Sequence, residues 1–191
     1  VVNRNSNDVT VINGSDNTTS TIGVGLHPLA ISTNPVTNKI YVLNNNSSNV
    51  TVIDGSYNRV EAVAAATNTN PNELADLIAI NPATNKIYLF DSNFNLSSSN
   101  VTVINGTDNS TTTVSAGSKP AAVVLNVVTN KVYVTNCGSF CGGLGPGSVT
   151  VIDGADNSTT TLTAVANPLA AAVNPVTNKV YVANLGDNSV T

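Results

Sequence analysis

The chain has 191 residues, of which only 9% are Asp, Glu, Lys or Arg, and its formal net charge is -4. Binding to phosphates needs clustered Lys and Arg, and the seven that occur here are spread along the chain, so nucleic acid and an anionic membrane surface are not expected as partners. No apolar run approaches the ~18 residues that span a bilayer. The chain opens without a charged and apolar leader, so we expect any secretion signal to lie outside this sequence.

One sequence unit occurs four times. The copies are NPVTNKIYV from Asn34, NPATNKIYL from Asn81, NVVTNKVYV from Asn126 and NPVTNKVYV from Asn174, at intervals of 47, 45 and 48 residues. A period in this range indicates one supersecondary unit copied in tandem, with each copy packed against its neighbours.

Each unit contains four short strand signals. In one unit, Ala121–Leu125 is a small apolar run typical of a strand buried on both faces, and Lys131–Thr135 alternates apolar and polar residues. Ser148–Asp153 alternates again, and Thr159–Thr163 is the most polar segment. Only Glu73–Ala79 approaches a helical pattern, and it is too short to form a stable helix.

Most links between these segments are too short for parallel crossovers, so the strands are expected to meander as antiparallel sheets. Burial is expected to fall from the first strand to the last, which a radial arrangement explains if the first strand lies at a crowded axis. We therefore predict an all-β fold, a β-propeller built of four-stranded antiparallel blades, with about four to five blades covered. The expected division is a partial blade over 1–25, blades over 26–68, 69–116 and 117–165, and a partial blade over 166–191.

The two ends of the sequence belong to the same phase of the repeat, because Val1–Thr10 aligns with Val182–Thr191 without a gap. We expect a segment of a longer array; the alternative is that the ends overlap in order to close a ring. Incomplete blades expose unpaired strand edges. We therefore expect that further blades, another copy or a partner chain are needed for stability.

Two recurring turns have a mechanical explanation. In Asn34–Lys39 the proline sets φ, and Asn38 tolerates the left-handed conformation. In Asp54-Gly55 and its counterparts the first side chain can bond the backbone ahead of it, and the glycine is expected to take a positive φ. Because the counterparts of Asp54 include Asn13 and Asn105, these carboxylates are interpreted as turn residues and not as a catalytic pair.

The words NPVTNKIYV, YVTN (Tyr133–Asn136), YVAN (Tyr181–Asn184) and VTVIDG resemble the YVTN family β-propeller repeat, known from archaeal surface-layer proteins and bacterial secreted proteins. The resemblance covers essentially the whole chain and implies a ring of about seven blades, of which part would be missing here. It implies no catalytic residues. The copy that begins at Asn81 departs from the pattern at Phe90-Asp91 and in the longer loop Leu96–Ser99, and in the next copy Asn126-Val127 lacks the proline.

The residues offer little reactive chemistry. His27 is the only histidine, and it is interpreted as structural or exposed. A zinc or copper site would need more His or Cys ligands than the chain has. A Ser-His-Asp triad would need His27 as its base, and no serine lies in a motif that supports this role. We expect no metal, no cofactor and no enzymatic activity. Cys137 and Cys141 are expected to form a disulfide in an oxidising compartment; a redox motif or a zinc site is the weaker alternative.

Two further positions recur in every unit. The lysines Lys39, Lys86, Lys131 and Lys179 could form a face that binds anions or polysaccharides, but solvated strand starts are the preferred interpretation. The tyrosines Tyr41, Tyr88, Tyr133 and Tyr181 are expected to fill the space between blades, with the hydroxyl reaching a partner.

Ten Asn-x-Ser/Thr sequons occur, many of them expected by chance in so polar a chain. Candidates for glycosylation are Asn17, Asn109 and Asn157, which share one turn position, together with Asn46, Asn49, Asn95 and Asn100. We expect at least the first three to carry sugar, if the organism N-glycosylates proteins outside the cell.

The pattern favours an extracellular or cell-surface structural and interaction module, in a surface layer, filament or adhesin. Its expected partners are other copies or domains of the same surface protein, with glycans as a further candidate. Two alternatives remain, a propeller that binds carbohydrate or another ligand, and a fragment of a secreted propeller enzyme whose active site lies elsewhere.

Overall fold

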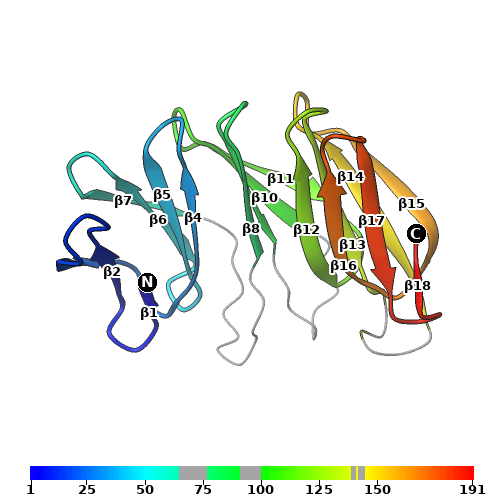
Figure 1. Cartoon of the computed structure of the whole chain (residues 1–191), viewed down its shortest axis with the longest axis horizontal. Coiled ribbons are helices and arrows are strands. Elements are labelled where there is room, and N and C mark those ends of the chain that lie inside the picture. Colours follow the sequence, from blue (N-terminus) through cyan, green and yellow to red (C-terminus); the bar gives the residue numbers. More distant parts are fainter. Residues whose placement is uncertain (65–76, 91–99, 139–140, 142–144) are drawn as a thin grey trace.

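The computed structural model describes residues 1–64, 77–90, 100–138, 141 and 145–191, with the backbone alone at residues 77 and 164. Every regular element within these residues is a β-strand (Figure 1). The strands form five sheets, numbered 1 to 5 here in chain order.

Sheets 1 and 5, at the ends of the chain, have three strands each. Sheet 1 contains β1 (Val2–Asn3), β2 (Asp8–Ile12) and β3 (Thr19–Gly23), and sheet 5 contains β16 (Pro168–Asn174), β17 (Lys179–Asn184) and β18 (Ser189–Val190).

Sheets 2, 3 and 4 have four strands each. Sheet 2 contains β4 (Pro28–Asn34), β5 (Lys39–Asn44), β6 (Asn49–Asp54) and β7 (Arg59–Ala64). Sheet 3 contains β8 (Leu77–Asn81), β9 (Lys86–Phe90), β10 (Asn100–Asn105) and β11 (Thr111–Ser115). Sheet 4 contains β12 (Pro120–Asn126), β13 (Lys131–Asn136), β14 (Pro146–Asp153) and β15 (Thr159–Ala166).

Each sheet is an antiparallel meander in which consecutive strands pair. The register repeats from sheet to sheet: Tyr41 lies opposite Val52 in sheet 2, and Tyr133 lies opposite Val151 in sheet 4. Within each pair of strands the side chains alternate between the two faces, so a fixed register brings the same repeat positions to the same face in every sheet.

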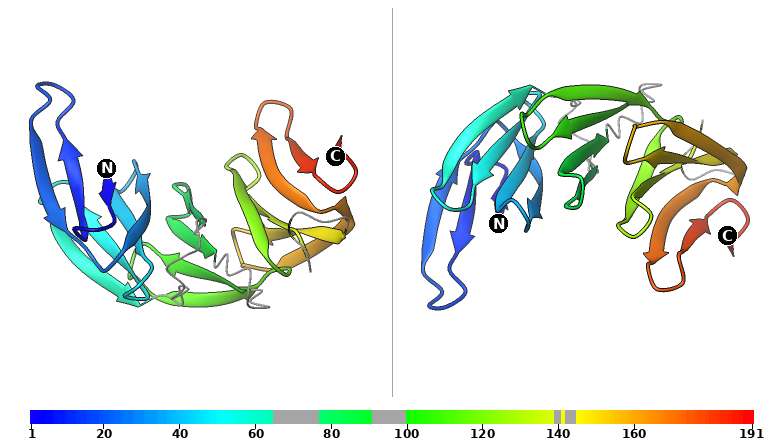
Figure 2. Two further views of the ribbon diagram at one scale, coloured as in Figure 1. Left: turned by 90° about the horizontal axis from the view of Figure 1, so that it is seen from below. Right: turned by 90° about the horizontal axis from the view of Figure 1, so that it is seen from above.

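The five sheets are fanned in an arc that is open on one side (Figure 2). The first strands β4, β8, β12 and β16 lie on its concave side, and each of β4, β8 and β12 contacts the first strand of the next sheet. The last strands β7, β11 and β15 lie on the convex side. This is the radial arrangement of propeller blades.

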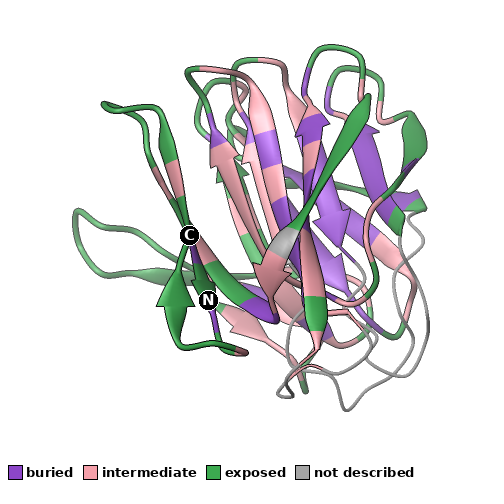
Figure 3. Cartoon of the chain, turned by 90° about the vertical axis from the view of Figure 1, so that its right-hand side faces the viewer, coloured by how far each residue is buried: buried purple, intermediate pink, exposed green. Residues whose placement is uncertain are grey.

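Burial is concentrated in the middle strands of each sheet (Figure 3). In β5 the segment Tyr41–Asn44 is buried, whereas β7 and β11 are largely exposed, as expected for last strands. The first strands differ from the expectation: Ala121–Leu125 in β12 is only half-buried. The reason is that the first strands line the open concave side, whereas the middle strands are covered on both faces by neighbouring sheets.

The asparagine that ends each Y-V-x-N word joins the second and third strands. The Nδ2 of Asn44 donates to the Thr51 hydroxyl at 2.8 Å, and the Nδ2 of Asn136 donates to the Thr150 hydroxyl at 3.0 Å. Asn3 and Asn184 make the same bond to Thr10 and Thr191. This side-chain bond therefore ties the two middle strands of the blade together.

The turn predictions are confirmed in one case and wrong in the other. Asn38 has a φ of 53°, in the left-handed region, as expected. In the Asp54-Gly55 turn the residue with positive φ is Asn58, at 53°, and not Gly55. Gly55 is needed for a different reason: a Cβ there would lie 2.8 Å from the carbonyl oxygen of Asn38, to which the Gly55 N–H donates.

Candidate functional site

Neighbouring sheets are joined by a repeated contact between two asparagine side chains. The amide nitrogen of the first asparagine in the N-P-x-T-N unit donates to the amide oxygen of the last asparagine in the next unit. The pairs are Asn34 with Asn85 at 2.9 Å, Asn81 with Asn130, and Asn126 with Asn178 at 2.7 Å. The three donor residues are fully buried. A buried amide without a partner costs about 1–3 kcal/mol, so this contact constrains how adjacent blades pack.

The same donor side chain also holds its own turn. The Oδ1 of Asn34 accepts the backbone N–H of Val36 at 3.0 Å and that of Thr37 at 3.4 Å. One asparagine therefore closes the turn with its oxygen and contacts the next blade with its nitrogen. No shorter or apolar residue provides both functions.

Two of the recurring lysines make a second contact between sheets. The Lys39 ammonium donates to the carbonyl oxygen of Gly106 at 2.7 Å, and the Lys86 ammonium donates to that of Gly154 at 2.7 Å and to the Asn157 side chain at 2.9 Å. These lysines are half-buried, so the expectation of freely solvated strand starts does not describe them. The prediction of an anion-binding face stays a prediction for Lys131 and for Lys179, which is exposed.

Tyr41 and Tyr88 fill the space between blades as predicted, because both side chains are fully buried. Neither hydroxyl has a hydrogen-bond partner among the described residues, which differs from the expectation. Burial raises the pKa of Tyr41, and burial with the nearby charge of Asp153 raises the pKa of Tyr88 to about 12. Tyr133 is half-buried and Tyr181 is exposed.

The glycine of a turn in the next blade lies against the buried Tyr41 hydroxyl. A Cβ built on Gly106 would be 2.7 Å from the Tyr41 hydroxyl and would also clash with the Asn85 amide. The asparagine, lysine and tyrosine contacts thus converge on two adjoining turns of the neighbouring sheet, which are joined by the Gly106 N–H that donates to the Asn85 carbonyl oxygen at 2.7 Å. We call this set of contacts the inter-blade clasp.

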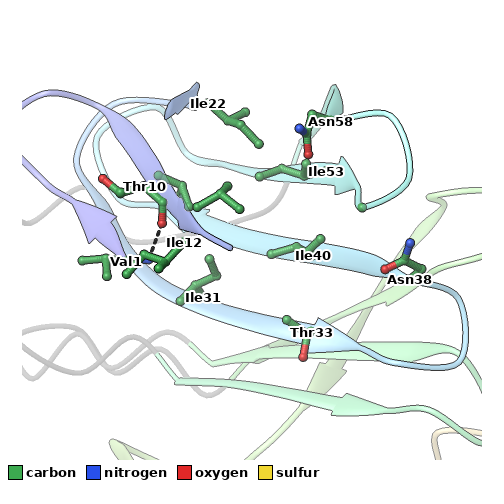
Figure 4. A pocket seen from close by; sticks show the side chains of 13 residues that line it. Val1, Thr10, Ile12, Ile22, Ile31, Thr33, Asn38, Ile40, Ile53 and Asn58 are labelled. Atoms are coloured by element: carbon green, nitrogen blue, oxygen red, sulfur yellow. Dashed lines mark hydrogen bonds between the residues drawn. The ribbon is translucent and has the colours of Figure 1, made fainter. Parts of the chain in front are cut away.

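A groove lies between sheets 1 and 2, where this clasp is incomplete (Figure 4). It has a volume of about 320 Å³. Its apolar walls come from β2, β3, β4, β5 and β6, and its polar end contains Asn38, Gly55 and Asn58. The residues along it are Val1, Val9, Thr10, Val11, Ile12, Ile22, Ile31, Thr33, Asn38, Ile40, Ile53, Gly55 and Asn58. Sequence reasoning missed this site, although the repeat alignment identifies Asn38 and Gly55 as clasp positions.

His27 lies at the entry to β4 with a φ of 50°. Its carbonyl oxygen accepts the Asn45 N–H at 3.0 Å, and its Nδ1 lies 2.6 Å from the Asn46 amide nitrogen. Lys119 and Asn167 precede the prolines of β12 and β16 with the same left-handed φ. His27 thus occupies a repeated structural position. Among the described residues no group of three or more His, Cys, Asp or Glu side chains is placed to hold a metal ion.

Cys137 and Cys141 form a disulfide, as predicted. Cys137 is fully buried at the end of β13, where its N–H donates to the carbonyl oxygen of Lys119 at 3.0 Å. This hydrogen bond therefore holds the start of the loop that follows β13 against the segment that precedes β12. Within the described residues, no helix has the length and apolar character that a membrane crossing requires.

The candidate glycosylation residues lie in different environments. Asn17 is exposed in the β2–β3 turn, and Asn46 and Asn100 are exposed. Asn109 donates to the Glu61 carboxylate at 2.8 Å, Asn157 accepts from Lys86, and the Asn49 oxygen accepts from Asn44 at 2.8 Å. Asn95 lies outside the described residues. Glycosylation of these residues stays a prediction, and Asn17 is the most accessible of the three that share a turn position.

Comparison with known proteins identifies the fold. No family model matches the chain, and no curated protein sequence matches it. Solved structures match: hydrazine synthase from Kuenenia stuttgartiensis has a TM-score of 0.72 and 16% identity, over 95% of this chain and 51% of that one. Dihydro-heme d1 dehydrogenase NirN, in complex with DHE, has a TM-score of 0.71 and 13% identity, over 100% of this chain and 42% of that one. A functionally unknown protein from Desulfotomaculum acetoxidans DSM 771 has a TM-score of 0.68 and 13% identity, over 100% and 59%.

These likenesses confirm the predicted all-β, blade-based propeller fold. The chain spans about half the length of the hydrazine synthase chain that it matches. They also contradict the prediction that the chain is not enzymatic, because two of the similar structures are enzymes. The reasoning behind the prediction was wrong. A propeller segment with few reactive side chains can belong to an enzyme as well as to a protein of another class.

Proposed function

We propose that this chain is part of an extracellular or cell-surface protein, in a surface layer, filament or adhesin, and that its blades form a rigid scaffold that presents loops to partners. The partners would be other copies or domains of the same surface protein, and glycans. We further propose that the blades are of the YVTN type, on the strength of the words NPVTNKIYV, YVTN and VTVIDG.

The observation that carries this proposal is the inter-blade clasp. It uses neutral amides, ammonium-to-carbonyl bonds and buried tyrosines. The amide contact recurs between successive sheets from sheet 2 to sheet 5, and the lysine contact recurs from sheet 2 to sheet 4. Such contacts depend little on paired surface charges, which salt screens at distances beyond ~10 Å. A repeat array held in this way gains rigidity from each neighbour that it adds.

Two other observations support the location. The Cys137–Cys141 disulfide suits an oxidising compartment. The exposed Asn17 sequon suits a chain that meets a glycosylation system.

The test is surface labelling of intact cells of the organism that makes the protein. A membrane-impermeant amine reagent should modify the exposed Lys179, and acid-quenched extraction should recover Cys137 and Cys141 as a disulfide. Intact-protein mass spectrometry would report any glycan in the same sample. Recovery of an unlabelled protein with two free thiols from the cytosolic fraction would refute the proposal.

A second candidate is a set of blades within a larger secreted enzyme, and the likeness to hydrazine synthase and NirN favours it. Purification of the natural full-length protein, with its visible absorption spectrum, would distinguish the two candidates. A bound chromophore in the purified protein would favour the enzyme, whereas incorporation of a colourless protein into the surface layer would favour the scaffold.

A further inference from the structure

Four charged side chains line one cavity on the outer part of sheet 2, in a chain where only 9% of the residues are charged. The cavity has a volume of about 310 Å³, and the residues that line it are Lys39, Val52, Asp54, Arg59, Val60 and Glu61. They come from β5, β6 and β7, the last three strands of this blade. A cavity of this volume is large enough for a small ligand.

The strand register places the four charges on one face of the sheet. Lys39 lies opposite Asp54, and Asp54 lies opposite Arg59, so a cation, a carboxylate and a second cation form a row across three strands. Glu61 lies two positions further along β7, opposite Val52, and therefore faces the same way. Hydrogen-bond donors and acceptors thus alternate over neighbouring strands.

The β10–β11 turn of sheet 3 adjoins this face. The Lys39 ammonium donates to the carbonyl oxygen of Gly106 at 2.7 Å, and the Glu61 carboxylate accepts from Asn109 at 2.8 Å. These bonds hold two side chains in place but leave further N–H groups on the ammonium and a second oxygen on the carboxylate. Among the described residues, no ion pair joins any two of the four charges, and the Arg59 guanidinium has no hydrogen-bond partner. The cavity therefore offers charged donors and acceptors with unused bonding capacity.

The other blades carry hydroxyl residues where this blade carries Arg59 and Glu61. The counterparts of Arg59 are Thr18, Ser110 and Ser158, and those of Glu61 are Ser20, Thr112 and Thr160. The same strand forms with serine or threonine at both positions in sheets 1, 3 and 4. The charges of sheet 2 are therefore additional to what the blade needs in order to fold.

The turn before β7 differs from its counterparts as well. Asp16, Asp108 and Asp156 each accept the backbone N–H two residues ahead and so close their turns. Tyr57 holds this position in sheet 2, where a tyrosine cannot accept that bond, and its ring is 77% exposed. An exposed aromatic ring thus replaces a turn bond between two residues that line the cavity, Asp54 and Arg59.

The chemistry of the cavity fits a neutral sugar. Its two cations and two carboxylates cancel, so the net charge favours neither an anion nor a cation as ligand. A sugar hydroxyl both donates and accepts, so neighbouring hydroxyls can donate to the carboxylates while they accept from the cations. Such bonds to charged groups are stronger than bonds between neutral groups. Val52 and Val60 offer apolar contact to the C–H groups of the sugar ring.

We propose that this cavity binds a neutral saccharide, with Arg59 donating to one hydroxyl oxygen and Glu61 accepting from the neighbouring hydroxyl. β7 lies on the convex side of the arc (Figure 2), so a longer glycan can extend away from the blades. The inference deepens the proposed function and rests on it for the source of the sugar, a glycan of the same cell surface.

The test is saturation-transfer NMR on the purified full-length protein. The probes are D-glucose, D-galactose, D-mannose and N-acetyl-D-glucosamine, each added alone. We expect saturation transfer to at least one of these sugars. Neither inorganic phosphate nor L-alanine should displace the sugar that binds, because the cavity selects hydroxyl groups and not a charged ligand.

Variants locate the binding in the cavity. Arg59→Ser and Glu61→Thr introduce the residues of sheets 3 and 4, so both proteins should fold, which circular dichroism checks. Each should weaken sugar binding about tenfold or more, because a hydrogen bond to a charged group is worth about that factor in affinity. Asp156→Asn is the control: it removes one charge from an exposed turn of sheet 4 and keeps an oxygen for the Ser158 N–H, and it should leave the affinity unchanged.

Three results would overturn the inference. One is the absence of saturation transfer to all of the sugars tested. The second is a bound sugar whose affinity neither Arg59→Ser nor Glu61→Thr lowers. The third is displacement of the sugar by phosphate or L-alanine, which would show that the cavity selects a charged ligand. Sugar binding by the purified protein does not depend on cellular location, so its failure and a cytosolic location of the natural protein are separate results.

Discussion

The side-chain nitrogen of Asn34 lies 2.9 Å from the side-chain oxygen of Asn85, although the two residues are 51 positions apart. Both belong to N-P-x-T-N turns, at the first position of one copy and the last position of the next. The same short sequence motif thus contains both the donor and the acceptor, and stacking of the blades brings the donor of one copy to the acceptor of the next. Every added copy creates one more such contact.

The first prediction tests this amide contact. Asn81→Asp keeps the oxygen that accepts the Ala83 N–H, but it removes the nitrogen that donates to Asn130 and buries a carboxylate beside the Asn130 oxygen. We expect the free energy of unfolding to fall by about 2–3 kcal/mol. Urea denaturation followed by circular dichroism measures it. Asn174→Asp is the control, because Asn174 makes the same turn bond but is exposed, and its effect should stay below about 0.5 kcal/mol. Equal effects would contradict the assignment.

The second prediction concerns the lysine contact. Lys86→Met keeps most of the stem but removes the ammonium that donates to Gly154 and Asn157, and should lower the free energy of unfolding by about 1–2 kcal/mol. Lys179→Met, at the same repeat position on the exposed end sheet, should change it by less than about 0.5 kcal/mol. The urea midpoints of the two variants give the comparison. A Lys86→Met protein as stable as the parent would show that the bond adds nothing.

The third prediction tests why the turn positions Gly106 and Gly14 are glycine. A glycine can be needed because a neighbouring group lies too close for a Cβ, or because of the backbone conformation. Gly106→Ala should lower the free energy of unfolding by about 1–3 kcal/mol, because its Cβ would meet the Asn85 amide and the Tyr41 hydroxyl. Gly14→Ala is the matched control: it holds the same repeat position, but nothing lies within 4 Å of its Cβ. Thermal unfolding of both variants measures the difference. If Gly14→Ala destabilised the chain equally, the requirement would lie in the backbone.

The fourth prediction follows from the pKa of Tyr88, which burial and Asp153 raise from 10.0 to about 12. Between these values the folded state keeps a proton that the unfolded state has lost, so stability is complete below pH 10 and falls as the pH rises towards 12. Tyr88→Phe should reduce this fall by an amount of the order of 2 kcal/mol.

At pH 7 the same variant should lie within about 1 kcal/mol of the parent, because the Tyr88 hydroxyl has no partner among the described residues. The measurement is urea denaturation at a series of pH values from 7 to 12. Parallel pH curves for the parent and Tyr88→Phe would contradict the raised pKa.

The recurrent sequence motifs determined the strands, their antiparallel order and the blade as the unit of the fold. Local rules are sufficient for this, because alternation selects strands, and Asn38 and its counterparts select the turns. The pairing of Cys137 with Cys141 was equally accessible, since the two residues are only four positions apart.

The contacts between blades could not be derived in this way, because they join positions that stacking brings together over about one repeat. Only the tertiary structure decided that Lys39 and Lys86 bind carbonyl oxygens of the next sheet, that Gly106 is required beside the Tyr41 hydroxyl, and that the first strands stay half-buried along an open axis. The groove between sheets 1 and 2 also could not be derived from the sequence. A groove is defined by the side chains that surround it, and those neighbours are known only once the sheets are placed against one another.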